Sequence, residues 1–214
     1  CADAETPEAV LNRLRHQRPA STAQVLLTFD DLDDLQNAAE VVACQRCPLS
    51  KEKRGGLHSL KTRAARVGEG DFVVLTGYIV SNPHDDRSGA SANCRLRGRA
   101  NNDFHIALAR ASTETEHDSI LTAMIPQHRP PQWTLERLNQ VARQNRLVMV
   151  KGQLLYDNEH EINDDPDNPI AGQPKRRFLW EIHPISEFFV CTRSRNACDP
   201  LSKNGWQRLE ELSL

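Results

Sequence analysis

The sequence predicts a mostly β fold with some α-helix, namely a five-stranded OB-like Greek-key barrel preceded by a small helical segment. Three observations predict it. Five segments rich in β-branched and aromatic residues follow residue 70, one helical pattern separates the third from the fourth, and long polar loops follow the first and the fourth. This order is typical of an OB-type barrel, and such barrels usually hold ligands with those two loops.

The strands are expected at residues 72–80, 103–109, 119–125, 147–156 and 177–191. The first and the fourth each contain a glycine, Gly77 and Gly152, where barrel strands often bend. The helix is expected from about Thr134, because apolar residues recur at helical spacing from there.

The last strand is the densest run of β-branched and aromatic residues, yet its interior contains Glu181 and His183. Alternation along a strand puts Trp180 and Ile182 on one face and these two polar residues on the other. Buried polar groups are costly unless they are satisfied. We therefore expect Glu181 and His183 to share a partner.

Three segments are expected along the chain: a helical N-terminal segment with a basic connector at 1–70, the barrel domain at 71–191 and a C-terminal tail at 192–214. The two helices of the first segment, which begin near Thr6 and Asp30, are predicted to be peripheral. A basic patch of Lys51, Lys53 and Arg54 is interpreted as a solvated face.

Length, charge and hydropathy exclude some classes of protein. The 214 residues are enough to bury a real core. With 27 basic and 29 acidic residues and a net charge of -2, the chain lacks the global basic field of a non-specific nucleic-acid binder. No apolar run approaches the roughly 20 residues that a membrane-spanning helix needs.

Cys1 stands at the first position and resembles the lipid-bearing residue of a mature bacterial lipoprotein. On this interpretation the protein is lipid-anchored in the bacterial periplasm or outer membrane, and it meets the membrane only through the lipid on Cys1. A trimmed N-terminus, and with it a cytoplasmic protein, is the alternative.

The other five cysteines predict structural disulfides. Cys44 and Cys47 form a CxxC pair, and Cys191 and Cys198 flank a short polar segment. Half of a zinc site or a redox pair are the alternatives for the CxxC. Cys94 then remains as an unpaired thiol.

Four short motifs lie between roughly residues 71 and 191: Asn93-Cys94, Asp103-Phe-His105-Ile, Gly152-Gln-Leu-Leu-Tyr-Asp157 and Leu179-Trp-Glu-Ile-His183-Pro. With these motifs this part of the chain resembles a group of uncharacterised bacterial OB-fold-like proteins. The resemblance implies a barrel-like domain, and it directs attention to Cys94, Asp103, His105 and His183. Residues 120–129 depart from the group pattern, which has an acidic residue on the third strand.

These residues suit several kinds of site. Cys94, His105 and His183 are zinc-ligand types, so zinc is the cofactor that such a site would take, with Asp103 or Glu181 as a further ligand or an orienting group. The same five residues are the candidates for a catalytic site in which a histidine activates Cys94. The alternative is structural: each histidine bonds a neighbouring carbonyl or carboxylate.

Charged residues crowd both long loops. Arg95, Arg97 and Arg99 lie in the first loop. One interpretation is that they pair with the acidic last loop; the alternative is that they bind phosphates, with Trp180 as a stacking platform for a base. The last loop is acidic, from Asp157 to Asp167, but it lacks the glycine and terminal glutamate of an EF-hand.

Three functions remain open. The preferred one is an envelope-anchored OB-type binding domain that acts through its loops on a protein partner in the cell envelope or on a small ligand. The second is a metal-dependent or Cys/His hydrolase, such as a phosphodiesterase. The third is single-stranded nucleic-acid binding.

Overall fold

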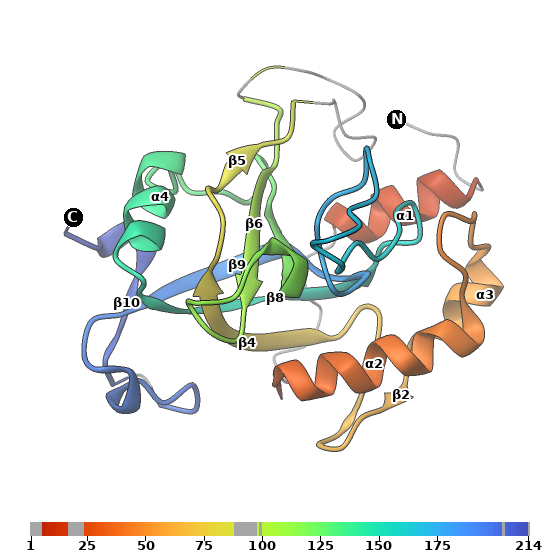
Figure 1. The fold of residues 1–214 in the computed structure, drawn as a ribbon, viewed down its shortest axis with the longest axis horizontal. Helices are drawn as coiled ribbons and strands as arrows, with labels where there is room; N and C mark the ends of the chain where they lie inside the picture. Colours follow the sequence, from red (N-terminus) through yellow and green to blue (C-terminus); the bar gives the residue numbers. More distant parts are fainter. Residues whose placement is uncertain (1–5, 17–23, 88–97, 99, 203, 214) are drawn as a thin grey trace.

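The computed structural model describes residues 6–16, 24–87, 98, 100–202 and 204–213, and within them a closed five-stranded β-barrel confirms the predicted fold class (Figure 1). The barrel strands are β4 (Phe72–Ile79), β6 (Phe104–Ala109), β7 (Ile120–Met124), β8 (Leu147–Tyr156) and β9 (Trp180–Cys191). Each lies within its predicted segment.

The barrel closes with the pairing of an OB fold. Strand β4 runs antiparallel to both β8 and β6, β8 to β9, and β6 to β7. The parallel pair of β7 and β9 completes the circuit. Helix α4 (Leu135–Arg143) lies between β7 and β8 in the chain, and the Thr134 side chain caps it by accepting a hydrogen bond from the Arg137 amide at 3.2 Å.

The N-terminal segment is integrated into the same core. It contains α1 (Pro7–His16), β1 (Val25–Leu27), α2 (Phe29–Val42), α3 (Lys51–Gly55), β2 (Leu60–Lys61) and β3 (Arg66–Val67). Strand β1, which the sequence did not predict, pairs in parallel with β4. The prediction that the helices are peripheral was wrong for α2, because Leu32 and Leu35 on its inner face are completely buried in the core.

The basic patch predicted before Gly55 was also wrong in part. Lys51 and Lys53 are exposed, but Arg54 is buried. Its guanidinium forms an ion pair with the buried Glu69 and donates a hydrogen bond to the Tyr156 carbonyl at 3.3 Å. A buried arginine is stable only with such partners, so Arg54 connects α3 to the end of β8 and takes no part in a solvated face.

The C-terminal segment also joins the barrel. The short strand β10 (Trp206–Arg208) pairs antiparallel with β9, and it is preceded by the 3-10 turn η3 (Arg195–Ala197) and followed by η4 (Leu209–Glu211). Leu209 is completely buried. Both predicted disulfides, Cys44–Cys47 and Cys191–Cys198, are present.

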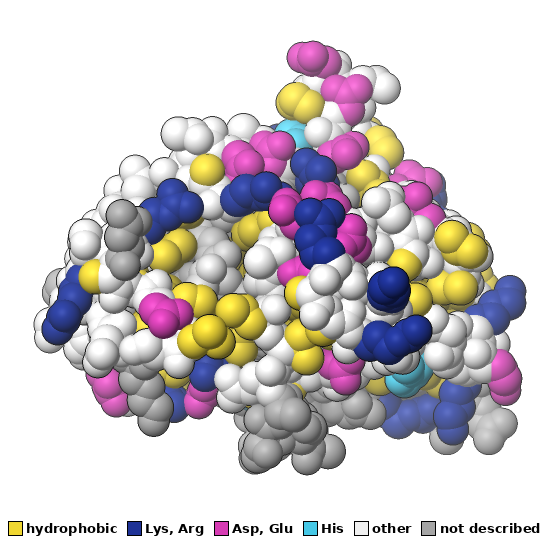
Figure 2. Space-filling view, turned by 90° about the horizontal axis from the view of Figure 1, so that it is seen from below, with side chains coloured by type: hydrophobic (Ala, Val, Ile, Leu, Met, Phe, Trp, Pro, Cys, Tyr) yellow, Lys and Arg dark blue, Asp and Glu magenta, His cyan; other side chains and the backbone are white. Residues whose placement is uncertain are grey.

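Outside the core the described surface has mixed charge. Asp30, Asp33 and Asp34 on α2 form ion pairs with Arg63, Arg110 and Arg177. Figure 2 shows acidic and basic side chains next to one another on the face that it views. None of the described helices combines the length and the apolar character needed to cross a bilayer.

Candidate functional site

A cleft of about 820 Å³ lies on the side of the barrel where OB folds usually bind ligands. Its floor is formed by β6, β7 and β9, on the side of the strands turned away from the core. One wall is the loop between β4 and β6, which contains the short strand β5 (His84–Asp85), and the other is the loop between β8 and β9. Helix α1 lies beside this second loop (Figure 1) and contributes Glu8 and Arg15 to the cleft.

His183 on β9 is held between two carboxylates at the bottom of the cleft. Its Nδ1 lies 3.3 Å from Oε2 of Glu181, and its Nε2 lies 3.5 Å from Oδ2 of Asp103. Burial alone would lower the pKa of His183, but these two carboxylates together raise it. The prediction that Glu181 and His183 lie on one strand face is confirmed, but they pair with each other instead of sharing a third residue, and Asp103 faces the other nitrogen of His183.

Arg176 connects this group to the β8–β9 loop. Its guanidinium donates hydrogen bonds to Glu181 and to Asp157, both at 2.5 Å, and all three side chains are buried. Burial and the nearby Asp157 would raise the pKa of Glu181, but the hydrogen bond from His183 and the charge of Arg176 lower it. The result is a buried chain of alternating charge along the floor of the cleft.

This series of ion pairs continues from Arg176 to the surface through Asp157. Its carboxylate bonds Nδ1 of His160 at 2.6 Å and lies 3.6 Å from the guanidinium of Arg15, which also bonds Glu159 at 3.0 Å. Burial alone would raise the pKa of Asp157, yet Arg176, His160 and Arg15 hold it well below its usual range. The hydrogen bond with Asp157 in turn raises the pKa of His160.

His105 on β6 occupies a different environment in the same cleft. It is half-buried, and its ring packs edge-on against His84 of β5 with 5.8 Å between ring centroids. Burial lowers the pKa of His105, and this effect outweighs the attraction of Glu181 and Asp103. The two histidines that the sequence singled out are therefore perturbed in opposite directions.

The lining of the cleft is acidic. It contains seven carboxylates, from Glu8, Asp86, Asp103, Glu116, Asp157, Glu159 and Glu181. Among the described residues of the lining, Arg15 and Lys175 are the ones that carry a permanent positive charge. Even with the neighbouring Arg176, acidic groups exceed basic ones in the described lining.

The structure brings together four of the five candidate site residues: Asp103, His105, Glu181 and His183 all line the cleft. Cys94, and with it the predicted zinc set and the catalytic cysteine, lies outside the described residues, as do Cys1, Arg95, Arg97 and Arg99. Among the described residues no group of three or more potential ligands is arranged to hold a metal ion.

Trp180 is not available as a stacking platform, which corrects that prediction. Its indole is completely buried and packs against Tyr156 with 5.2 Å between ring centroids. The reason is the alternation of β9, which turns Trp180 into the barrel interior when Glu181 faces the cleft.

Sequence reasoning missed Arg15, His160 and Arg176 as members of the site. No local pattern distinguishes Arg176 from its neighbours Lys175 and Arg177, which are both exposed. The one available signal was the need of Glu181 for a cationic partner, which did not indicate where in the chain that partner lies.

The fold and the site define this chain as an OB-like barrel protein with an acidic cleft. The chain matches no protein-family model, and the search of curated proteins found no match either. Among solved structures it is similar to OBody AM3L09 bound to hen egg-white lysozyme, with 14% sequence identity and a TM-score of 0.28 over 57% of this chain and 82% of that chain. This similarity is too low to suggest a ligand, and the barrel is assigned from its strand pairing.

Proposed function

We propose that this protein is a binding domain that takes a positively charged partner into the acidic cleft. The observation that carries the proposal is the position and charge of the cleft: it lies at the usual ligand face of an OB fold, and its described lining contains seven carboxylates and two permanent cations. A surplus of one charge in a concave site attracts ligands of the opposite charge. The partner chemistry is a cluster of amines or guanidinium groups, on a small polyamine or on a basic segment of a protein.

The buried chain of ion pairs supports binding because it holds the floor of the cleft in a fixed shape. Arg176 fixes Asp157 and Glu181, and His183 connects Glu181 to Asp103. A site that is ordered before its ligand arrives loses less entropy on binding. The two disulfides support a location in an oxidising compartment such as the bacterial envelope, where we propose that the partner is met.

The two other functions have less support. Phosphates would face a lining with more acidic than basic groups, and Phe104, Tyr156 and Trp180 are buried, so no described residue among them offers a ring to a base. A hydrolase is favoured by the opposite pKa shifts of His105 and His183. However, both ring nitrogens of His183 already face carboxylates, which suits a structural role.

The test is titration calorimetry with spermine and with a short Lys/Arg peptide on the purified protein. A double variant Glu116→Gln and Glu159→Gln removes two carboxylates from the cleft, keeps the volume of both side chains, and leaves the buried Asp103, Asp157, Arg176, Glu181 and His183 unsubstituted, although Arg15 loses one of its two carboxylate partners. We expect spermine affinity to fall by about tenfold in this variant, because each exposed charge contributes roughly 0.2–1 kcal/mol.

The matched control is Asp164→Asn with Asp165→Asn, which makes the same change of charge in the β8–β9 loop that also carries Glu159, but outside the cleft lining. We expect it to retain nearly all of the affinity. A wild-type protein that binds neither probe, or an equal loss in the two double variants, would contradict the proposal.

A further inference from the structure

The Cys44–Cys47 disulfide lies at the surface, in the link between α2 and α3. Cys44 is exposed and Cys47 is half-buried, with 5.8 Å between their Cα atoms. Disulfide exchange requires that a thiolate reaches one of the two sulfur atoms. An exposed bond of this kind is accessible to a reducing partner.

The residues between the two cysteines hold the β8–β9 loop in place. The amide of Arg46 donates to the His160 carbonyl at 3.3 Å, and the amide of Cys47 donates to the Asn158 carbonyl at 3.2 Å. The amide of Ile162 donates to the side chain of Gln45 at 3.0 Å. An ion pair of 3.5 Å between Arg46 and Glu161 adds to these contacts.

These contacts depend on a backbone shape that the disulfide helps to fix. Arg46 has a φ of 51°, which is unfavourable for a residue with a side chain. The cross-link between the residues on either side of this turn restricts the alternatives open to it. Without the cross-link the turn can relax, and the amides of positions 46 and 47 then lose their orientation toward the loop.

The loop held in this way is the wall of the acidic cleft. Asp157, Glu159 and His160 all line the cleft and belong to this stretch. Asn158 lies between them and bonds both the Cys47 carbonyl and the buried Arg54. The disulfide is therefore only one layer of contacts away from the residues proposed to bind the ligand.

We propose that Cys44–Cys47 is a redox modification site whose reduction by a protein dithiol loosens the β8–β9 loop and weakens binding in the cleft. A thiolate of the dithiol attacks one sulfur, a mixed disulfide forms, and the other cysteine leaves as a thiolate. The second thiolate of the partner then displaces the first cysteine. Both cysteines end reduced and the partner ends as a disulfide, with two electrons transferred. The effect on ligand binding rests on the proposed function, whereas the effect on the loop does not.

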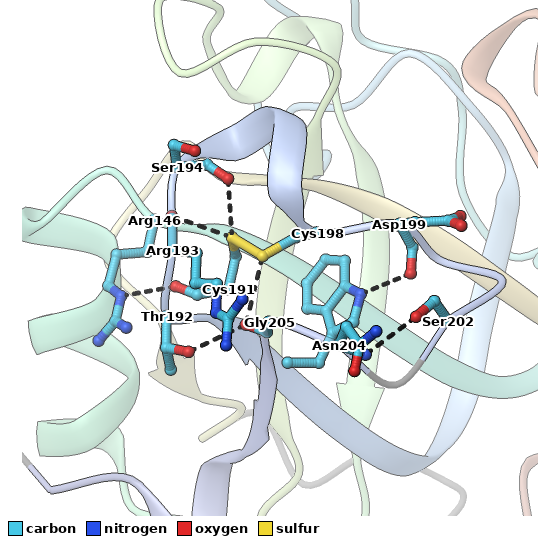
Figure 3. The surroundings of a disulfide bond; sticks show 11 residues. Arg146, Cys191, Thr192, Arg193, Ser194, Cys198, Asp199, Ser202, Asn204 and Gly205 are labelled. Atoms are coloured by element: carbon cyan, nitrogen blue, oxygen red, sulfur yellow. Dashed lines mark hydrogen bonds between the residues drawn. A yellow bond between two sulfur atoms is a disulfide. The ribbon is translucent and has the colours of Figure 1, made fainter.

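The second disulfide provides a control within the same molecule. Cys191 and Cys198 are 4% and 6% exposed, and neither lines the cleft. Figure 3 shows this bond enclosed by the end of β9 and the turn that leads to β10, where Arg146 donates to the Cys191 carbonyl at 3.0 Å. Removal of the Cys191–Cys198 disulfide is expected to affect the end of the barrel where β9 ends.

The experiment compares the double variant Cys44→Ser and Cys47→Ser with the control Cys191→Ser and Cys198→Ser by amide hydrogen exchange without ligand. In the first variant we expect the amides of positions 46, 47 and 162 to exchange about fivefold faster or more, because their acceptors are no longer held in place. In the control these three amides should be unchanged. Unchanged exchange in the first variant, or equal acceleration in both, would overturn the proposal.

Two further measurements complete the test. Wild-type protein is treated with increasing dithiothreitol, alkylated and mapped by mass spectrometry, and we expect positions 44 and 47 to be labelled before positions 191 and 198. The opposite order would overturn the proposal even if a variant failed to fold. Spermine titration of the oxidised and the reduced protein then measures the affinity of the cleft, and we expect weaker binding after reduction. If the oxidised protein itself does not bind spermine, the proposed function is wrong, and the exchange result still decides the redox site. If oxidised and reduced protein bind spermine equally, the proposed effect of reduction on the cleft is wrong.

Discussion

At the scale of single residues, the cleft depends on Arg176 because it is the cation that two buried carboxylates share. Asp157 and Glu181 are 1% and 2% exposed, and each bonds a different nitrogen of the Arg176 guanidinium. Removing one member of a buried ion pair leaves the other charge without compensation, which costs far more than the pair contributes. The neighbouring Arg177 bonds Asp33 at the surface instead.

Arg176→Met is therefore expected to lower the free energy of unfolding by about 3–5 kcal/mol. Arg177→Met removes the same charge one position along the chain and is expected to cost at most about 1 kcal/mol, because exposed ion pairs contribute little. Urea denaturation of the two variants measures both values. Similar losses in the two would show that Arg176 does not stabilise the floor of the cleft.

At the scale of elements, the β8–β9 pair bends where Gly152 sits. The register between the strands shifts on both sides of this glycine, and a Cβ atom added to it would lie 2.4 Å from the Pro184 carbonyl oxygen and 2.7 Å from Cγ2 of Ile182. The backbone of β9 approaches so closely that only glycine fits. Beyond this glycine, Glu181 and Ile182 of β9 pair with β8 on one side and with β7 on the other, and this double pairing closes the barrel at the floor of the cleft.

Gly152→Ala is expected to destabilise the barrel by about 1–3 kcal/mol, because the new methyl group must displace backbone atoms of β9. Gly55→Ala is the matched control, since a Cβ there meets nothing within 4 Å. It should leave stability unchanged or raise it by less than about 1 kcal/mol. Thermal unfolding of both variants measures the two changes in stability. An unchanged stability of Gly152→Ala would contradict the close approach of the β9 backbone to Gly152.

At the scale of the whole molecule, the acidic cleft is assembled from parts that are distant in the sequence. Arg15 comes from α1, Asp157 and His160 from the β8–β9 loop, and His183 from β9. The protonated forms of His160 and His183 are stabilised by carboxylates only in the folded chain. Protonation and folding are consequently linked.

The sign of this linkage follows from the direction of the shifts. A histidine whose pKa is raised by folding stabilises the folded state, and this stabilisation is fully present at pH values below its pKa in the unfolded chain, about 6.5. The stabilisation is lost as the pH rises through the raised pKa of the folded state. We expect the difference in unfolding free energy between wild type and His160→Gln to be largest below about pH 6.5 and to shrink as the pH rises above that value. Urea denaturation on both sides of that value measures the difference. A difference that is constant or that grows with pH would contradict the role of the pair formed by His160 and Asp157.

The sequence by itself determined the barrel and its order of strands. Alternation, strand length and the helix after Thr134 are local properties of the chain, so the five strands and both disulfides were predictable. Alternation also predicted that Glu181 and His183 share a face and need a partner. These statements depend only on neighbours in the sequence.

Only the tertiary structure decided which residues satisfy that need. Arg15 and Asp157 meet across 142 positions of the sequence, and Arg54 lies 104 positions from Asn158. No local pattern encodes such contacts, because they follow from the closure of the barrel and the packing of α1 and α3 against it. The same closure brought the carboxylates of α1, the β8–β9 loop and β9 together into one acidic cleft, whereas Trp180, which the sequence had offered as a stacking platform, lies in the barrel interior.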